Sequence, residues 1–506
     1  MRITQCLLTA AAASSLFACD PSSDAPSSPT AAQFAAGFVT SQPAQARAIL
    51  PQAKVQPIIT VGDPIPGATD ADAEQRVWAP IPDGLGAYQT ADGLVLFANH
   101  EITSGGVGGH FKNARVSRLV LDPATVSVKS GAYAITGQRT SGAPVGPLVQ
   151  RLCSATFNGS AEAFIPGWFF TGEESFTATT GGMQLAVKND GSEVRQLPWL
   201  GRIAHENYVA VPGFGNKFVL LGTDDNNGAS ELYMFVANSA AGVLAGDGKL
   251  FAFASDQPIH SGNMTPGQTI TGQFLEIADP TALPAALQTE ADNLGDHGAM
   301  PFVRLEDIDY SRSPDETGPA VYFVDTGNDL TSGRTAGKVN VQCTPAPCDR
   351  AGSIYRMELN ASSPTTGAKL TLLARSRGVA AGDWASPDNI SVSRKSLMLQ
   401  EDPAYSGFNR PERMWNFKLK HGGGLGEARA VVELETQRFT GVVCSEPTGS
   451  CWESSGVIDA SDWLGEGTWL FDVQAHTLPF SYRDGAATVN LPNEGGQLLY
   501  LRLPGS

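Results

Sequence analysis

The chain has 506 residues, of which 51 are acidic and 34 basic, and its formal net charge is −17. No run of Lys or Arg forms a patch that could follow a phosphate backbone, so the composition argues against nucleic acid as a partner. The 55 glycines and 33 prolines divide the chain into short apolar stretches of strand length, with few long helical periodicities. We therefore expect an all-β fold, with helices confined to connections.

The N-terminus has the features of an export signal. A single arginine precedes the apolar and small-residue segment Cys6–Ala18, which is too short to span a bilayer as a mature helix. Its end, Leu16–Cys19, resembles the lipobox of bacterial lipoproteins, in which Cys19 becomes the lipidated first residue. Plain signal-peptide cleavage is the alternative. We expect a signal peptide over residues 1–18, followed over residues 19–54 by the lipidated cysteine and a flexible Ser/Pro/Ala-rich tether.

Five further cysteines fit an exported chain. Cys343 and Cys348 close one small Pro-containing loop, and Cys444 and Cys451 close another. Because an exported chain meets oxidising conditions, these spacings predict two local disulfides and leave Cys153 as a free thiol. A zinc site is the weaker interpretation, since both Cys-x-x-Cys and His-Glu-x-x-His are absent.

Short acidic motifs recur at the edges of strand-like apolar runs such as Trp168–Phe170 and Phe218–Leu221. In chain order the motifs are Thr171–Ser175, Gly201–Asn207, Gly222–Asn227, Val303–Ile308, Ser386–Asn389 and Gln400–Asp402. Carboxylates at strand ends can converge in space although they are far apart in sequence. Like charges a few ångströms apart raise one another's pKa unless hard cations neutralise them. The motifs therefore predict a multi-metal site.

A loose repeat indicates a β-propeller. An acidic or polar pair opens an alternating strand at His205–Val211, Leu305–Tyr310 and Pro387–Val392. Propeller blades give this pattern, with the start of each inner strand pointing at the central channel. We expect a single propeller domain over residues 55–506, with six blades and long insertions because the spacing is irregular. A β-sandwich is the competing fold, but it does not explain why acidic pairs recur at one end of the strands.

From Asn99–Glu101 and Ala114–Asp122 through to Glu401, the chain resembles the PhoX-type alkaline phosphatases, which are calcium-dependent exported β-propellers. The resemblance is strongest over Gly201–Val236, where Gly-Arg-Ile-Ala-His-Glu-Asn is followed by Gly-Thr-Asp-Asp and then by Glu-Leu-Tyr-Met-Phe-Val. The shared order and spacing of these strings make the resemblance specific, although each string alone is weak.

In that family a paired-iron and calcium cluster binds phosphate. The resemblance implies that six carboxylates hold the cations here: Glu173, Glu174, Glu206, Asp225, Glu306 and Glu401. It also implies that Arg304 holds the phosphate and that Glu206 and Glu306 act with it in catalysis. Gly172 stands where typical members have an iron-binding cysteine, so the resemblance implies a divergent member that uses calcium and leaves iron open.

Several of these residues also have a plain structural interpretation. Glu173 and Glu174 could form an exposed turn, and Asp224–Gly228 is a good turn sequence without any ion. Arg304 could pair with Glu306 instead of binding phosphate.

The leading hypothesis is an exported, metal-dependent phosphatase that hydrolyses phosphomonoesters. One alternative is a calcium-dependent propeller lactonase or phosphotriesterase, which needs fewer carboxylates. The other is a non-catalytic calcium-binding surface lipoprotein. We expect a monomer that acts on small phosphorylated substrates and is held by its lipid anchor at a bacterial cell envelope or cell surface.

Overall fold

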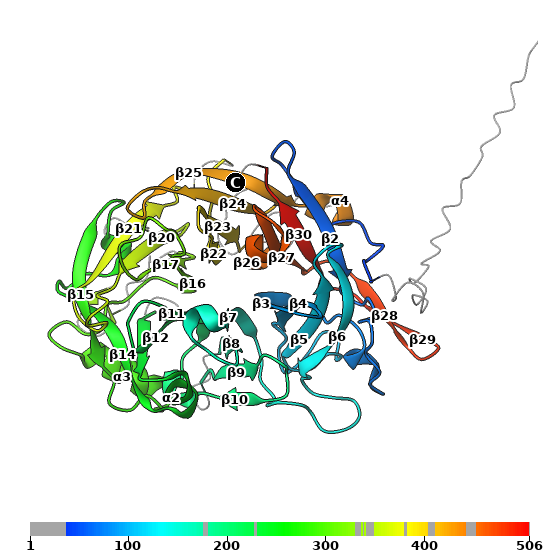
Figure 1. The fold of residues 1–506 in the computed structure, drawn as a ribbon, viewed down its shortest axis with the longest axis horizontal. Coiled ribbons are helices and arrows are strands. Elements are labelled where there is room, and N and C mark those ends of the chain that lie inside the picture. Colours follow the sequence, from blue (N-terminus) through cyan, green and yellow to red (C-terminus); the bar gives the residue numbers. More distant parts are fainter. Residues whose placement is uncertain are drawn as a thin grey trace, which may run out of the picture.

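In the computed structural model, the strands are arranged around a central axis (Figure 1). It describes residues 37–175, 181–226, 230–328, 335–336, 339–340, 349–378, 382–402, 410–441 and 452–504. The expected lipidation site Cys19 and the expected disulfide partners Cys343, Cys348, Cys444 and Cys451 lie outside these residues. Cys153 is a free, buried thiol.

Two four-stranded sheets of consecutive antiparallel strands begin the ring. The first contains β3 (Pro82–Thr90), β4 (Gly93–His100), β5 (Arg115–Asp122) and β6 (Ser127–Ile135). The second contains β7 (Leu152–Asn158), β8 (Trp168–Glu173), β9 (Gln184–Lys188) and β10 (Val194–Gln196).

A nine-stranded sheet forms the next part of the ring, in the order β11-β12-β13-β14-β15-β21-β20-β17-β16. Its strands are β11 (His205–Val211), β12 (Phe218–Asp224), β13 (Leu232–Ala237), β14 (Gly248–Ser255), β15 (Thr269–Glu276), β16 (Leu305–Tyr310), β17 (Ala320–Asp325), β20 (Ser353–Glu358) and β21 (Ala368–Arg375). The small hairpin β18–β19 pairs Thr335–Ala336 with Val339–Asn340. Helices α2 (Ala240–Ala245) and α3 (Pro284–Asn293) lie in its connections.

Strands from both ends of the chain close the ring. A five-stranded sheet contains β22 (Pro387–Val392), β23 (Ser396–Glu401), β24 (Arg413–Leu419), β25 (Leu425–Leu434) and β1 (Ala46–Ala48). The last sheet contains β26 (Glu453–Asp459), β27 (Thr468–Ala475), β30 (Gly495–Arg502) and β2 (Lys54–Thr60). Helices α4 (Thr436–Thr440) and α5 (Ser461–Leu464) and the hairpin β28–β29 (Phe480–Asp484, Ala487–Leu491) complete this part. The chain joins the sheets earlier than the expected tether end at residue 54, because β1 already pairs with β25.

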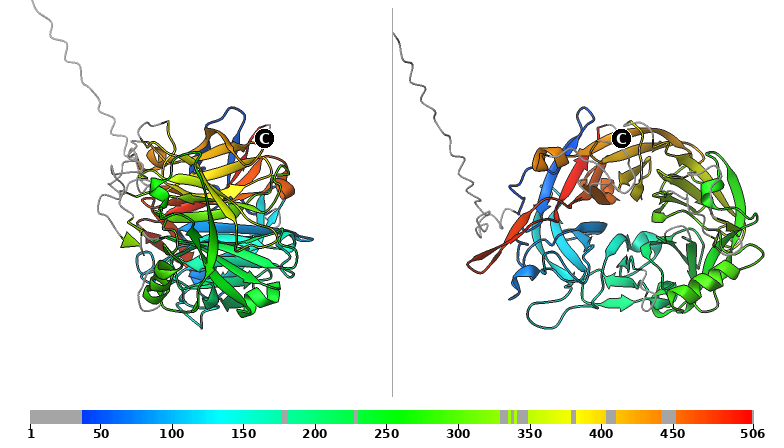
Figure 2. Two further views of the ribbon diagram at one scale, coloured as in Figure 1. Left: turned by 90° about the vertical axis from the view of Figure 1, so that its left-hand side faces the viewer. Right: turned by 180° about the vertical axis from the view of Figure 1, so that it is seen from behind.

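Packing between neighbouring sheets forms the core. Strand positions alternate between two faces, so the apolar residues of one sheet meet those of the next. Phe97 of β4 stacks on Phe169 of β8, with ring centroids 5.1 Å apart. On the other side of the first sheet, Leu94 packs in one cluster with Leu470 and Leu498 of the last sheet. These interfaces set the sheets side by side around the axis, as the view from behind also shows (Figure 2).

The innermost strands contact one another in a closed series: β3 with β7, β7 with β11, β11 with β16, β16 with β22, β22 with β26, and β26 with β3. The expected all-β, propeller-like architecture is therefore confirmed, as four blades plus the nine-stranded sheet. No helix within the described residues is long and apolar enough to cross a membrane.

Candidate active site

Two cavities lie at opposite ends of the space between the inner strands. The smaller cavity, of about 380 Å³, is lined by residues near the strand starts, including Cys153 of β7, Glu206 of β11 and Glu306 of β16. The larger cavity, of about 680 Å³, is lined by later residues of the same strands, such as Phe157 and Asp309. Each inner strand therefore presents different side chains to the two ends.

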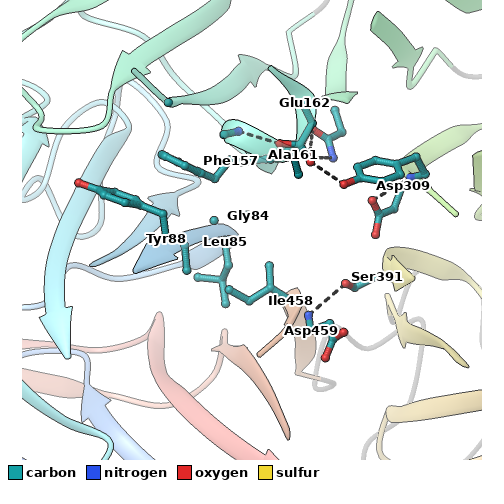
Figure 3. Close-up of a pocket in the computed structure, with 18 of the residues that line it drawn as sticks. Gly84, Leu85, Tyr88, Phe157, Ala161, Glu162, Asp309, Ser391, Ile458 and Asp459 are labelled. Carbon is teal, nitrogen blue, oxygen red and sulfur yellow. Dashed lines mark hydrogen bonds between the residues drawn. The ribbon is translucent and has the colours of Figure 1, made fainter. Parts of the chain in front are cut away.

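The larger cavity carries carboxylates that already have partners (Figure 3). Glu162 accepts hydrogen bonds from the Tyr310 hydroxyl at 2.5 Å and from the Gly159 backbone N–H at 2.7 Å. Asp309 accepts from Arg312 Nη1 at 2.6 Å and from the Val392 backbone N–H at 2.7 Å. Satisfied groups of this kind hold the wall together, so this larger space is not the candidate metal centre.

The smaller cavity collects acidic side chains, and we call it the acidic cavity. Its charged lining consists of Glu101, Arg151, Glu174, Glu206, Asp225, Arg304, Glu306, Asp388, Asp402, Glu453, His476 and Glu494. Cys153 lies among them. The acidic side chains outnumber the two arginines.

Bulges aim these side chains inward. Register shifts occur between Pro82 and Leu85, Leu152 and Ala155, His205 and Tyr208, Leu305 and Ile308, and Pro387 and Ile390. In each strand, the residue directly after the first of these two positions is an acid or a cysteine. These residues are Asp83, Cys153, Glu206, Glu306 and Asp388. A bulge bends its strand and re-aims the side chain that it carries. The same local device therefore places one potential ligand from each of five inner strands.

A polar layer separates the two cavities. Asn389 Nδ2 donates to Ser154 Oγ at 2.8 Å, and Ser154 Oγ donates to Glu206 Oε2 at 3.2 Å. Asn207 Nδ2 donates to Asp307 Oδ1 at 2.7 Å. These residues fix the floor of the acidic cavity, because each bond joins two different strands.

Three groups of side chains could each hold a metal ion, with ligand atoms within 4.8 Å of one another. They are Asp83, Glu101 and Cys153; Cys153, Glu174 and Glu206; and Glu206, Asp225 and Glu306. Cys153 and Glu206 each belong to two groups, so the groups form one continuous cluster. Glu206 Oε1 is buried without a hydrogen-bond partner, as expected of an oxygen that binds a cation. The donors suit hard cations at the oxygens and a softer metal such as iron at the thiolate.

Burial and mutual repulsion disturb the cluster's ionisation. Burial, followed by the charges of Glu174 and Asp225, raises the pKa of Glu206 well above its ordinary value. Burial also raises the pKa of Glu174 to about 8, with contributions from Glu101 and Asp225 and an opposing one from Arg151. The Cys153 thiol behaves similarly, because burial and then Asp83 raise its pKa. Without cations the cluster therefore retains protons that bound metals would displace.

Two arginines offset part of the negative charge. Arg304 donates from Nε to Asp225 Oδ1 at 2.9 Å and from Nη2 to Asp225 Oδ2 at 2.6 Å, and Nη2 also lies 3.0 Å from Glu306 Oε1. Arg151 pairs with Glu101 at 3.1 Å and with Glu174, and nearly half of its side chain is exposed. Its backbone is left-handed, with φ of 48°, a strained conformation of the kind that often marks functional sites.

Comparison with known proteins identifies the family. A family model described as alkaline phosphatase PhoX matches residues 186–457. The chain belongs to the PhoX family. No curated protein sequence matches the chain.

The solved structure of Pseudomonas fluorescens PhoX in complex with vanadate, a transition state analogue, is similar in fold, with a TM-score of 0.61 and 15% sequence identity. The match covers 92% of this chain and 97% of that one. The periplasmic gluconolactonase of Pseudomonas aeruginosa is 13% identical, with a TM-score of 0.32 and coverage of 75% and 97%. The aldose sugar dehydrogenase of Streptomyces coelicolor is 12% identical, with a TM-score of 0.35 and coverage of 89% and 99%. The last two similarities are too remote to inform the site.

The structure brings most of the expected PhoX site residues together. Glu174, Glu206, Asp225, Arg304 and Glu306 all line the acidic cavity. The interpretation of Arg304 as a partner of Glu306 also holds, since the guanidinium contacts both Asp225 and Glu306.

Two of the expected metal ligands do not line this cavity. Glu173 Oε1 accepts a hydrogen bond from the Gln150 backbone N–H at 2.9 Å. Glu401 is buried and held on both oxygens, with Arg410 Nη1 and Nη2 each at 2.8 Å and Trp415 Nε1 at 2.8 Å. A carboxylate so fully paired within its own sheet has little remaining capacity to bind a cation.

The structure corrects the interpretation of Gly172. A Cβ atom at this position would lie 2.2 Å from the Cβ of His205, so a side chain here would collide with β11. The thiol of the cluster comes instead from Cys153, on the neighbouring strand β7. The chain therefore does carry a cysteine at the acidic cluster, and the argument against iron from Gly172 does not hold.

Sequence reasoning missed several members of the cluster. Asp83, Cys153 and Glu453 were not expected there. Glu101 was noted only as part of the family resemblance, and Asp388 only as part of an acidic motif. A signal was present: Pro82-Asp83-Gly84 and Leu152-Cys153-Ser154 open their strands as Ala204-His205-Glu206-Asn207 opens β11. The cysteine in place of an acid hid the repeat.

Proposed function

We propose that this PhoX-family protein is a metal-dependent phosphatase that hydrolyses phosphomonoesters in the acidic cavity. The observation that carries the proposal is the convergence of carboxylates, one thiol and two arginines, from the inner strands and the strand ends beside them, at one end of the channel. Such a donor set suits several cations acting on one small anionic substrate.

The residues proposed to hold the metals are Cys153, Glu174, Glu206, Asp225 and Glu306, which form the overlapping groups described above. Calcium fits the oxygen donors, and iron fits the site that includes the thiolate. When bound, the cations would polarise the phosphoryl oxygens and activate the attacking group. Asp388, Glu101 and Glu453 line the same cavity and could complete the coordination.

The proposed role of Arg304 is to neutralise a phosphoryl oxygen of the substrate. Its guanidinium is held by Asp225 and Glu306, so it is oriented before substrate arrives. A planar, pre-oriented guanidinium suits bidentate recognition of phosphate. The exposed part of Arg151 offers a second cationic group at the same cavity.

The experiment that tests this function is hydrolysis of p-nitrophenyl phosphate by the purified protein, before chelation, after chelation, and after calcium and iron are restored separately and together. We expect chelation to abolish turnover and restored metal to recover it. Hydrolysis of a lactone and of a phosphotriester such as diethyl p-nitrophenyl phosphate, measured in parallel, separates a monoesterase from the alternative lactonase or phosphotriesterase. Tight calcium binding without turnover of any of these substrates would leave the non-catalytic alternative.

We also propose that the nine-stranded sheet counts as two blades, which makes six in all. The closed series of contacts among β3, β7, β11, β16, β22 and β26 supports this count, since each of them occupies the innermost position of its sheet or half-sheet. The β15–β21 pairing, which covers four residue pairs, joins the two halves and accounts for the single sheet.

The protein's proposed place of action is the bacterial cell envelope, where it would be attached through Cys19 and act as a monomer. The support is the export-like segment Cys6–Ala18 and the lipobox-like Leu16–Cys19.

A further inference from the structure

The two arginines of the acidic cavity differ in depth. Both line the cavity. The side chain of Arg151 is 45% exposed, whereas that of Arg304 is 16% exposed. Arg151 is therefore the guanidinium that a part of the substrate outside the reacting phosphoryl group can reach.

The backbone fixes the position of Arg151. Its φ of 48° is a left-handed conformation, which costs free energy in a residue other than glycine. Two hydrogen bonds hold this conformation. The Arg151 backbone N–H donates to the Ile102 carbonyl at 3.1 Å, and the Arg151 carbonyl accepts from the Glu174 backbone N–H at 2.9 Å. The residue is thus held between the chain segments that follow β4 and β8.

One end of the Arg151 guanidinium is open to a ligand. Its Nε donates to Glu101 Oε1 at 3.1 Å, and its Nη2 donates to Glu174 Oε2. Its Nη1 makes no hydrogen bond within the described residues. Because the group is planar and carries five N–H donors, the two acids fix its plane and leave Nη1 and the second N–H of Nη2 for an end-on contact.

Bound cations would make the charge of this arginine available. Glu101 and Glu174 each belong to a candidate metal group. In the metal-free protein these carboxylates neutralise Arg151. When cations occupy the groups, the carboxylates balance the cations instead, so the guanidinium can attract an anion.

The two arginines lie close enough to bind one small molecule. Burial raises the pKa of Glu174, and the charges of Arg151 and Arg304 are both among those that oppose the rise. Glu174 is therefore within electrostatic range of both guanidiniums. The cavity, of about 380 Å³, has room for a compact molecule. A substrate that contacts both arginines would carry its second anionic group a few bonds from the phosphate.

We propose that Arg151 binds a carboxylate on the leaving group of the substrate while Arg304 holds the phosphoryl group. The preferred substrates are then compact phosphomonoesters of hydroxy acids. A carboxylate matches the planar end of the guanidinium and its single charge. This inference rests on the proposed phosphatase function. If Arg151 only neutralised its two acids, or shared the phosphoryl group with Arg304, its loss would affect all phosphomonoesters alike.

The test compares 3-phosphoglycerate with glycerol 3-phosphate, which has a hydroxymethyl group in place of the carboxylate. We expect the wild type to favour 3-phosphoglycerate in kcat/KM for phosphate release, and Arg151→Ala to lower this preference at least about tenfold. Arg151→Lys should keep part of the preference. Arg312→Ala, beside the larger cavity, is the matched control and should keep it in full. The same preference in the wild type and Arg151→Ala would overturn the proposal, because loss of metal or of folded protein lowers both rates together.

Binding of the corresponding phosphonates, in which a methylene group replaces the ester oxygen, separates this proposal from the phosphatase function. Calorimetry on the calcium-loaded protein needs no turnover. We expect the carboxylated phosphonate to bind at least about tenfold more tightly than its hydroxymethyl counterpart, and Arg151→Ala to remove most of the difference. If the protein hydrolyses neither ester but keeps this difference, the phosphatase function fails and the carboxylate site stands. Equal affinity of the wild type for the two phosphonates, or binding of neither, would overturn the proposal.

Discussion

Arg304 holds Asp225 through two parallel hydrogen bonds, from Nε at 2.9 Å and from Nη2 at 2.6 Å. Arg304 directly precedes β16 and Asp225 directly follows β12, so the pair links two strands of the nine-stranded sheet. Both residues line the acidic cavity. The arginine therefore has two tasks. It holds Asp225, a carboxylate proposed to bind metal, and it presents its guanidinium to the cavity.

The first prediction concerns Arg304→Ala. We expect turnover of p-nitrophenyl phosphate to fall at least about tenfold, since one charge-assisted contact in the transition state is worth more than about 1.4 kcal/mol. The measurement is kcat/KM of the metal-loaded variant. Arg304→Lys should recover little, because an ammonium group cannot reproduce the two parallel bonds.

The control for Arg304 is Arg312→Ala. Arg312 lies close to the other end of the same strand and pairs with Asp309 at 2.6 Å, beside the larger cavity. Its loss should leave kcat/KM within about twofold of the wild type. Equal losses in the two variants would show that any ion pair on this strand supports activity, and would remove the argument for a phosphate contact.

The second prediction concerns the thiol. Cys153→Ser should lower the iron content of the isolated protein and leave calcium largely in place, because serine keeps the size of the side chain but removes the soft thiolate donor. Elemental analysis and the loss of visible thiolate-to-iron absorption would measure this. Iron content equal to that of the wild type would show that Cys153 is not a ligand.

The third prediction concerns Gly172, where the added Cβ would meet His205 at 2.2 Å. Gly172→Ala should lower the free energy of unfolding by about 1–3 kcal/mol, the usual cost of overpacking, and should not raise iron content. Gly318→Ala is the control, because nothing lies within 4 Å of its added Cβ. A stable Gly172 variant that gains iron would restore the interpretation of this position as a missing ligand.

The sequence predicted the strand ends and their acids well, because a turn signal followed by an acidic pair is a local feature. It assigned both Glu173 and Glu174 to the metal site. Glu173 is the last residue of β8 and Glu174 follows it, so the path of the chain out of β8 determines that Glu174 alone of the two reaches the acidic cavity. Glu401 lies away from the cavity lining for a non-local reason: Arg410 and Trp415, which hold its carboxylate, come from outside β23. The bulges that align Asp83 and Cys153 with the acids of later strands likewise depend on pairing between strands.

The fourth prediction is a pH dependence of the metal-free protein. Burial first, and then Glu101 and Asp225, raise the pKa of Glu174 from 4.5 to about 8 in the folded chain. The folded state therefore holds this proton more tightly than the unfolded chain. Its stabilising effect is full below about pH 4.5 and is lost as the pH rises through about 8, by roughly 1.4 kcal/mol per pH unit for one group.

We therefore expect the thermal midpoint of chelator-treated protein to fall between about pH 5 and pH 8. Calcium should remove most of the fall, because it binds the ionised carboxylates of the folded state alone. A midpoint that rises with pH in the absence of metal would contradict the raised pKa of the cluster.

The last prediction separates a metal ligand from a structural acid. Glu206 belongs to two of the candidate metal groups, whereas Glu401 is bound on both oxygens by Arg410. Glu206→Gln should therefore lose metal and turnover together, since an amide is a weaker ligand than a carboxylate. Glu401→Gln should instead leave a buried arginine without its counter-charge and destabilise the fold by about 3–5 kcal/mol.

The two variants are distinguished by metal content per folded chain, measured after gel filtration, and by the urea midpoint. We expect folded Glu401→Gln to keep the wild-type metal content and turnover per bound metal, at a lower midpoint. The urea midpoint of Glu206→Gln should lie below that of the metal-loaded wild type and match that of the metal-free wild type. Both the variant and the metal-free wild type lack the stabilisation by bound ions. Loss of metal from folded Glu401→Gln would place that carboxylate back among the ligands and would show that its pairing with Arg410 gives way to a cation.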